Sequence, residues 1–270
     1  MLRGGESVKR ELPIAVFDSG LGGMSLLSEL IKILPNEDFL YFGDTANAPY
    51  GMKSADEVRC LTEKNLEYLL SLGIKAFVIA CNTATSAAAA HLREKYRDIP
   101  IIGIEPALKP VTLCEGKPTV AVLATPLTLK GEKFADLLAK YSGDARVIPF
   151  ACPGLVEFVE KGIFEGEELD AFLSELLAPL KKEKIDCAVL GCTHYPLVKG
   201  AIIKALGEDV RLFDGGYGTA RQTARRLEAA DLLSASTERG RIDIIDSSYP
   251  NQINPEGSIL YRFSKEYICN

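Results

Sequence analysis

Two cysteines have the most informative surroundings in this chain. Cys81 follows the apolar run 77–80 and Cys192 follows the run 188–191, and polar residues come directly after both thiols. Each run has the length and composition of a buried strand, so each thiol is predicted to lie at a strand end. Two thiols in matching positions predict two half-sites that face each other across a cleft. Chemistry that needs one thiol on each side of a substrate is a short list, and racemisation heads it.

The residues around each thiol favour a reactive cysteine over a structural one. A single buried cysteine is most often structural. Here Asn82 and Thr83 follow Cys81 at the start of a predicted helix, and a helix N-terminus lowers the pKa of a thiol. Cys192 has the same placement, with His194 shortly after it to protonate a substrate or to tune the thiol.

A glycine-rich turn, Asp18–Gly23, separates the first predicted strand from its helix. Its backbone N–H groups and the helix N-terminus are suited to bind a carboxylate or a phosphate. A tight turn that uses glycine for positive φ, with Asp18 as a helix N-cap, is an equally good interpretation. The loop 43–51 presents the same choice between gripping an amino-acid headgroup and forming a turn from Pro and Gly.

Metal binding and redox chemistry have less support. No C-x-x-C pair occurs, and Cys81, Cys192 and His194 would be ligands from scattered loops without a recognisable spacing. We therefore expect no metal, and a zinc site or a redox-active pair of thiols is the weakest alternative. His91 lies inside a helical pattern and is expected to be structural or exposed. By its local pattern, Glu157 belongs to the solvated face of a short helix.

The predicted elements alternate between short apolar runs and longer helical patterns, which is typical of parallel sheets covered by helices. Strands are expected at 13–17, 38–42, 76–80, 101–104, 119–124, 146–150, 186–190, 210–213 and 242–245. Helices are expected at 23–34, 54–72, 81–96, 126–141, 154–161, 167–184, 197–206 and 218–233. The fold class is therefore α/β: two similar domains, each a mainly parallel sheet flanked by helices, with the active site in the cleft between them.

The pattern restarts halfway along the chain, which indicates an internal duplication. The segment 14–19 aligns with 120–125, and the two cysteine segments align at nearly the same offset. We expect a first domain made of 12–104 plus 214–270, carrying Asp18 and Cys81. A second domain would span 105–213 and carry Cys192 and His194. The first eleven residues are expected to be a flexible N-terminus.

Composition and charge limit the partners of this protein. The formal net charge of −6 offers no basic face of the kind that nucleic acid or anionic membranes require. Residues 1–11 do not resemble a signal peptide, and no apolar stretch is long enough to span a membrane. Seven cysteines without an export signal favour reduced thiols. We expect a cytoplasmic protein that acts on a small molecule.

Four motifs together resemble bacterial glutamate racemases, from about residue 13 to residue 245. They are Ile14–Gly23, Tyr41–Gly51, Ala80–Thr85 and Gly191–Pro196. The resemblance implies a cofactor-independent racemase with two α/β domains, the active site between them, and D-glutamate for peptidoglycan as its product. It is compatible with a homodimer without fixing the dimer interface.

The resemblance also implies roles for individual residues. One of Cys81 and Cys192 would remove the α-proton while the other delivers a proton to the opposite face. Asp18 and His194 match assisting acid/base residues, and Glu157 matches a third carboxylate sometimes given that role. The positions that match substrate-holding residues are Asp18, Ser19, Pro49, Tyr50, Gly51, Asn82, Thr83, Thr125, Thr128, Thr193 and His194.

Differences from the family's sequence pattern and two alternative functions leave part of this interpretation open. The stretches 214–216 and 124–128 differ from the usual family pattern, which leaves details of the pocket and of oligomer contacts open. The nearest rival is an aspartate racemase of the same superfamily, although His194 after Cys192-Thr193 favours glutamate. A protein of another class, a non-catalytic module that senses an anionic metabolite with the Asp18–Gly23 turn, is the remaining alternative.

Overall fold

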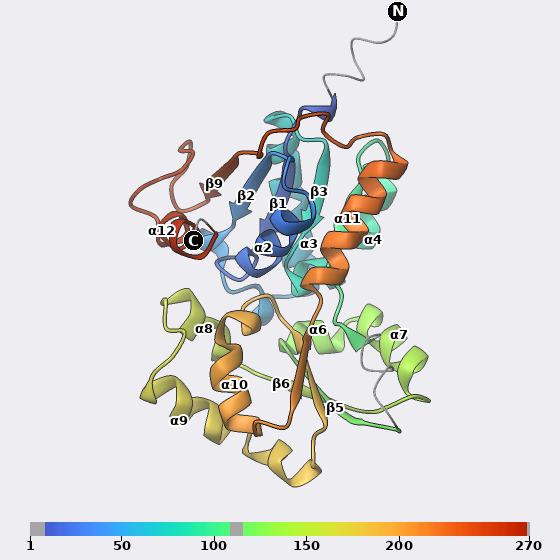
Figure 1. Cartoon of the computed structure of the whole chain (residues 1–270), viewed down its shortest axis with the longest axis vertical. Helices are drawn as coiled ribbons and strands as arrows, with labels where there is room; N and C mark the ends of the chain where they lie inside the picture. The colour runs from blue at the N-terminus through green and yellow to red at the C-terminus, as the bar shows by residue number, and fades with distance from the viewer. Residues whose placement is uncertain (1–8, 109–115, 269–270) are drawn as a thin grey trace, which may run out of the picture.

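The computed structural model describes residues 9–108 and 116–268, and it contains two parallel sheets, one in each of two lobes (Figure 1). Residues 1–8 of the predicted flexible N-terminus lie outside the described residues. The chain leaves the first lobe after β4 (Ile101–Gly103) and returns to it after β8 (Arg211–Asp214). No helix in the described ranges is long and apolar enough to cross a membrane.

The first sheet has five parallel strands. Their order is β4 (Ile101–Gly103), β3 (Ala76–Ile79), β1 (Ile14–Asp18), β2 (Phe39–Gly43) and β9 (Ile242–Asp246). Every residue of β1 is buried, as expected for a central strand that helices cover on both faces. Ile14 and Val16 pack toward α2 (Met24–Ile33), whereas Ala15 and Phe17 pack into the cluster with α3 (Ala55–Ser71) and α4 (Asn82–Lys95).

The second sheet repeats the first with one strand fewer. Its order is β6 (Arg146–Ala151), β5 (Thr119–Ala124), β7 (Cys187–Gly191) and β8 (Arg211–Asp214), again all parallel. In this order β5 corresponds to β1 and β7 corresponds to β3. The outer strands then correspond as well, β6 to β2 and β8 to β4. The predicted α/β fold of two similar units is therefore confirmed, and β9 is the extra edge strand of the first sheet.

The helices flank both sheets and are mostly close to their predicted positions. They are α2 (Met24–Ile33), α3 (Ala55–Ser71), α4 (Asn82–Lys95), α6 (Pro126–Lys130), α7 (Glu132–Tyr141), α8 (Leu155–Glu160), α9 (Glu167–Leu176), α10 (Lys199–Leu206), α11 (Gly216–Ala229) and α12 (Ile259–Ile268). Local capping explains several starts. Ser54 and Glu57 form a capping box that begins α3, and Thr125 accepts a hydrogen bond from Thr128 N at the start of α6.

Three segments differ from the sequence prediction. The helix expected up to 141 is broken at Gly131 into α6 and α7, because the extended backbone of that residue ends one helix and begins the next. The helix expected over 167–184 ends at Leu176 and continues as the 3-10 turn Ala178–Glu183, which begins next to Pro179. The polar tail after Asp246, for which no element was predicted, contains α12.

Candidate active site

Cys81 stands between β3 and α4 and is the N-cap of that helix. Its sulfur accepts a hydrogen bond from Ala84 N at 3.4 Å, and its thiol lies 3.9 Å from Ser19 Oγ. Burial raises the pKa of the Cys81 thiol to about 12, and the charge of Asp18 acts in the same direction. The expectation that the helix N-terminus would lower this pKa is therefore wrong for this structure, because the loss of hydration outweighs the single N–H donor.

Cys192 occupies the corresponding place after β7 in the second lobe and is buried as well. Its sulfur lies 3.6 Å from Nδ1 of His194. The two thiols thus follow equivalent strands of the two repeats, β3 and β7, as the sequence predicted. Each has its own polar neighbours, a serine hydroxyl beside Cys81 and an imidazole beside Cys192.

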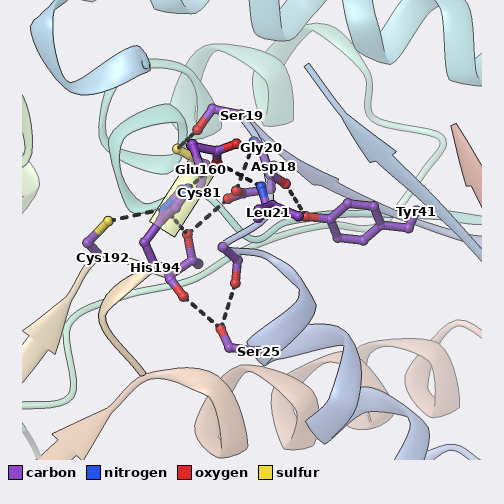
Figure 2. A network of polar contacts seen from close by, with 12 residues as sticks. Asp18, Ser19, Gly20, Leu21, Ser25, Tyr41, Cys81, Glu160, Cys192 and His194 are labelled. Carbon is purple, nitrogen blue, oxygen red and sulfur yellow. Dashed lines mark hydrogen bonds and ion pairs between the residues drawn. The ribbon is translucent and has the colours of Figure 1, made fainter. Parts of the chain in front are cut away.

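His194 connects Cys192 to a carboxylate. Its Nε2 lies 2.5 Å from Oε1 of Glu160, and the same oxygen accepts a hydrogen bond from Leu21 N at 2.8 Å (Figure 2). Burial alone would lower the pKa of His194, but the contacts with Cys192 and Glu160 outweigh it and raise that pKa well above 6.5. Burial likewise opposes the charge of Glu160, and His194 reverses this and lowers the pKa of that carboxyl. The pair is therefore ionised.

Asp18 lies at the end of β1, completely buried, and faces the same group of residues. Gly20 N donates to its Oδ2 and Thr193 Oγ1 donates to its Oδ1, each at 3.1 Å. Burial raises the pKa of Asp18 to about 6, although the nearby His194 partly offsets the rise. Asp18 is not a helix N-cap, because α2 begins only at Met24 with Gly23 in the cap position.

The glycine-rich turn binds two carboxylates of the protein itself. Its Gly20 and Leu21 N–H groups bind the protein's own carboxylates, those of Asp18 and Glu160. None of its glycines has positive φ. A Cβ on Gly20 would lie 1.9 Å from Glu160 Oε1, and a Cβ on Gly22 would lie 2.4 Å from His194 Nδ1. Glycine is needed here so that side chains of the second lobe can approach the backbone of the first.

The carboxylate that contacts His194 is Glu160, whereas the residue that the resemblance implies as a third carboxylate is Glu157. Glu160 contacts His194 and the turn, whereas Glu157 lies one helical turn earlier in α8. Both glutamates, together with Pro49, line a hollow of about 540 Å³ that is bounded by residues of both lobes. Two glutamates three positions apart share one helix face, so no local signal distinguishes them. Only the approach of the first lobe selects Glu160.

Three threonines from both lobes share a hydroxyl cluster. Thr83 Oγ1 lies 3.0 Å from Thr125 Oγ1 and 3.3 Å from Thr128 Oγ1, and the latter two hydroxyls lie 2.9 Å apart. All three residues are buried. The loop with Gly51 approaches them closely, since a Cβ on that glycine would lie 2.9 Å from Thr125. The structure thus brings together four of the predicted substrate-holding positions.

The loop after β2 is organised by a buried carboxylate, Asp44. Its oxygens accept hydrogen bonds from the Tyr50 hydroxyl at 2.6 Å, Asn65 Nδ2 at 3.0 Å and Asn47 Nδ2 at 2.9 Å. The Ala48–Pro49 peptide bond is cis. These contacts hold Tyr50 in place, and with it the loop that carries Pro49; both residues are predicted to hold the substrate.

Asn82, directly after Cys81, carries a polar atom that the protein leaves unpartnered. Its Oδ1 is buried and has no hydrogen-bond partner among the described residues. An unpartnered buried acceptor is costly, and a hydrogen-bond donor on a bound molecule would satisfy it. This amide therefore has the position and the chemistry to accept a hydrogen bond from a bound ammonium group.

Other predicted features lie outside this group. His91 is on the surface of α4, 3.3 Å from Glu63 Oε2. The described residues contain no group of three or more His, Cys, Asp or Glu side chains that could hold a metal ion. A larger hollow of about 1340 Å³ is lined by residues such as Arg93, Tyr217 and Arg226, and by none of the predicted site residues.

Comparisons with known proteins agree with this geometry. The sequence profile of the Asp/Glu/Hydantoin racemase family matches residues 24–223. Glutamate racemase of Clostridium novyi (strain NT) is 52% identical over 242 residues, which cover 90% of this chain and 93% of that protein. Glutamate racemase of Clostridium perfringens (strain SM101 / Type A) is 50% identical over 244 residues, 90% of this chain and 94% of that protein.

Solved structures show the same fold. Glutamate racemase isoform RacE1 from Bacillus anthracis has a TM-score of 0.83 at 31% identity and covers 97% of this chain and 95% of its own. Glutamate racemase from Francisella tularensis subsp. tularensis SCHU S4, crystallised in complex with D-glutamate, has a TM-score of 0.80 at 30% identity and the same coverages.

The chain belongs to the Asp/Glu/Hydantoin racemase family. It is a racemase, an enzyme of the isomerase class, and within the family it is similar over nearly its whole length to glutamate racemases. The resemblance inferred from the four sequence motifs is therefore confirmed.

Proposed function

We propose that the protein interconverts L- and D-glutamate by proton transfer between Cys81, Cys192 and the α-carbon, without a cofactor. The observation that carries the proposal is the placement of the two buried thiols after equivalent strands of two repeated lobes. A carboxylate or an ion pair stands beside each of them. Such an arrangement suits a reaction that treats the two faces of one carbon alike.

The two thiols would exchange roles during one turnover. A thiolate removes the α-proton and becomes a thiol, and the C–H electron pair remains on the substrate as a carbanion conjugated with the carboxylate. The opposite thiol then delivers its proton to the other face and becomes the thiolate. Burial raises the pKa of Cys81, so this thiol would begin as the proton donor, and the protonated His194 lies beside the other thiol, Cys192.

The charged groups around the thiols would stabilise the transition state. An amino-acid α-proton is far less acidic than a thiol, so the developing negative charge needs donors that are already in place. His194 is charged by its contact with Glu160 and lies beside one thiol. Asp18, with a pKa of about 6, can hold or release a proton on the other side near neutral pH.

The remaining predicted residues would hold the substrate. The unpartnered Oδ1 of Asn82 would accept a hydrogen bond from the ammonium group. The hydroxyl cluster around Thr83 and the residues Ser19, Pro49, Tyr50 and Gly51 would bind the carboxylates. We assign Thr125, Thr128 and Thr193 to the same task from the second lobe, as the resemblance implies.

The first test is incubation of the purified, chelator-treated protein with L-glutamate in D2O. We expect loss of optical rotation together with entry of deuterium at the α-carbon, without any added cofactor. L-aspartate in the same assay tests the rival substrate, and turnover of aspartate alone would replace the glutamate assignment. Cys81→Ala and Cys192→Ala should each abolish racemisation, and full activity in either folded variant contradicts the two-thiol mechanism.

The proposed reaction also implies a metabolic role and a cellular location for the protein. D-glutamate is the product that peptidoglycan synthesis requires, and the supply of it would place the enzyme in the cytoplasm. A homodimer is proposed as the assembly. Light scattering coupled to size exclusion measures the molar mass directly, and a value near 29.3 kDa would correct the assembly to a monomer.

A further inference from the structure

Tyr41 on β2 places a buried hydroxyl directly beneath the glycine-rich turn. The residue is completely inaccessible to solvent and belongs to the core cluster with α2. Its hydroxyl donates a hydrogen bond of 2.6 Å to the carbonyl oxygen of Gly20 (Figure 2). A Cβ on Gly23 would lie 2.6 Å from this hydroxyl, so a glycine there gives the phenol room to reach the turn. A buried tyrosine hydroxyl needs a partner, and here the partner is the turn.

The Gly20 carbonyl that Tyr41 binds belongs to the same peptide group as the Leu21 N–H, which binds Glu160. The C=O of Gly20 and the N–H of Leu21 belong to the same planar group, so fixing one fixes the direction of the other. That N–H donates to Glu160 Oε1 at 2.8 Å, and the same oxygen lies 2.5 Å from His194 Nε2. The hydrogen bonds run in series through one rigid plane and polarise one another.

The turn also holds the carboxylate of the first lobe. Gly20 N, the other amide of that glycine, donates to Asp18 Oδ2 at 3.1 Å. Displacement of Gly20 would therefore disturb both carboxylates that the site uses. No other hydrogen bond of the Gly20 carbonyl is found among the described residues, so Tyr41 alone anchors it.

We propose that Tyr41 is a positioning residue of the racemase: its hydroxyl orients the Gly20–Leu21 peptide, and that peptide holds Glu160 against His194. Tyr41 acts through the turn and touches neither thiol. The catalytic consequence rests on the proposed function, whereas the structural consequence can be measured without substrate.

The test uses Tyr41→Phe, which keeps the ring and removes the hydroxyl. The chain has only two histidines, so NMR of protein labelled in the imidazole rings resolves His194 and His91 separately. The groups that face His194 are Asp18, Glu160 and Cys192. With Glu160 no longer held, we expect the pKa of His194 to fall in the variant, while that of the distant His91 stays unchanged.

Kinetics supplies the second readout. We expect kcat of Tyr41→Phe to fall roughly 10- to 100-fold in both directions with little change in KM, as for a small misplacement of a reacting group. The primary isotope effect with α-deuterated glutamate should rise, because proton transfer becomes slower. A merely structural role would reduce the folded fraction and leave the isotope effect and the pKa of His194 unchanged.

Two further variants complete the experiment. Tyr96→Phe removes a hydroxyl that donates to Glu67 Oε1 at 2.8 Å on the surface, and it should leave His194 and kcat unchanged. p-Aminophenylalanine at position 41 keeps a donor at the ring end, so it should restore the wild-type pKa of His194 and most of kcat. The proposal is overturned if folded Tyr41→Phe has the wild-type pKa of His194. It is also overturned if the folded p-amino variant has the same His194 pKa and the same kcat as Tyr41→Phe. Should the wild type fail to racemise glutamate, only the proposed function is lost, because the titration needs no substrate.

Discussion

At the residue scale, the site depends on charges that are kept out of water. Asp18 and His194 are buried, and Glu160 is mostly covered. Burial disfavours each charge, and the direction of each pKa shift depends on which partner opposes burial. His194 and Glu160 neutralise each other and remain ionised, whereas Asp18 has only neutral donors and a more distant cation, so its pKa rises.

Glu160→Gln tests whether Glu160 or Glu157 is the third carboxylate that assists the reaction. The amide keeps the shape of the side chain but loses the charge of Glu160, which together with the contact to Cys192 raises the pKa of His194. We expect kcat to fall roughly 100-fold or more, the range for loss of an acid/base partner. Glu157→Gln, one turn earlier on the same helix, is the matched control and should remain within about threefold of the wild type. Steady-state kinetics in both directions measures this, and the reverse ranking of the two variants would restore the original assignment to Glu157.

The raised pKa of Asp18 predicts a dependence of stability on pH. Its folded pKa of about 6 lies above the ordinary value of 3.8, so the folded state binds the proton more tightly than the unfolded state. The stabilisation is present below about pH 4 and is lost as pH rises through 6. Asp18→Asn, which has no charge to bury, should therefore be more stable than the wild type at pH 8, by up to about 3 kcal/mol, and similar to it at pH 4. Urea unfolding at the two pH values measures the difference.

Activity should move in the opposite direction to stability. Asp18→Asn removes a group that can take up a proton near neutral pH, so we expect slower turnover in the more stable protein. A variant that is less stable than the wild type at pH 8 would show that the hydrogen bonds from Gly20 and Thr193 outweigh the cost of burying the charge.

At the scale of the elements, the site forms where one turn of the first lobe meets two segments of the second. Leu21 N binds Glu160 of α8, and Ser25 Oγ donates to the carbonyl of Thr193 at 3.0 Å. These contacts require the turn between β1 and α2 to have no side chain at Gly20 and Gly22. Side chains of the second lobe thus pack directly against the backbone of this turn, and the interface between the lobes has no room for added side-chain atoms there.

Gly22→Ala should disrupt that junction. The new methyl group would meet His194 Nδ1 at 2.4 Å and Thr193 Oγ1 at 2.6 Å, and both atoms belong to buried residues. We expect a loss of stability of about 1–3 kcal/mol and a loss of most activity. Gly218→Ala in α11 is the control, because a Cβ there meets nothing within 4 Å and alanine favours the helix by about 1 kcal/mol. Thermal melting and turnover of the two variants check this, and an active, stable Gly22→Ala would mean that the lobes separate without cost.

At the scale of the whole molecule, the chain must leave the first lobe, build the second and return. The segment that returns to the first lobe is held at the amino ends of the strands of the first sheet, opposite the site. Glu37 and Lys75 form an ion pair with both side chains almost fully buried. Glu37 Oε1 accepts from Ser234 N at 2.8 Å, and Lys75 Nζ donates to the carbonyl of Arg10. One buried pair therefore connects the start of the chain, the first sheet and the segment between α11 and β9.

Lys75→Met should destabilise the fold without impairing the chemistry. Removal of one partner leaves the Glu37 carboxylate buried without its cation, which costs about 3–5 kcal/mol. The turnover number per folded molecule should stay at the wild-type value, because the pair touches no residue of the site. Lys75→Met combined with Glu37→Gln should recover part of the stability, as measured by urea unfolding. A double variant that is less stable than Lys75→Met would show that the hydrogen bond to Ser234 requires a charged acceptor.

The amino-acid sequence by itself determined the strands, the duplication and the two thiols. Apolar runs such as 77–80 and 188–191 are periodic and local, and the polar residues after them mark the sheet edge where parallel strands place ligands. The repeat of this pattern in the second half predicted two similar units, because similar sequence patterns form similar structures, whereas the strand order β4-β3-β1-β2 is known only from the tertiary structure. The candidates Asp18, Cys81 and Cys192 were found from these local patterns.

Only the tertiary structure decided which groups of one lobe meet which groups of the other. Glu160 and Glu157 are indistinguishable on their helix, and the glycines of the turn look like conformational glycines until a second lobe approaches them. The pKa of Cys81 was misjudged for the same cause, since a local helix N-terminus is visible in sequence and complete burial is not. Contacts between distant segments, and the loss of water that they bring, depend on the packing of the whole chain and leave no pattern in any short stretch of it.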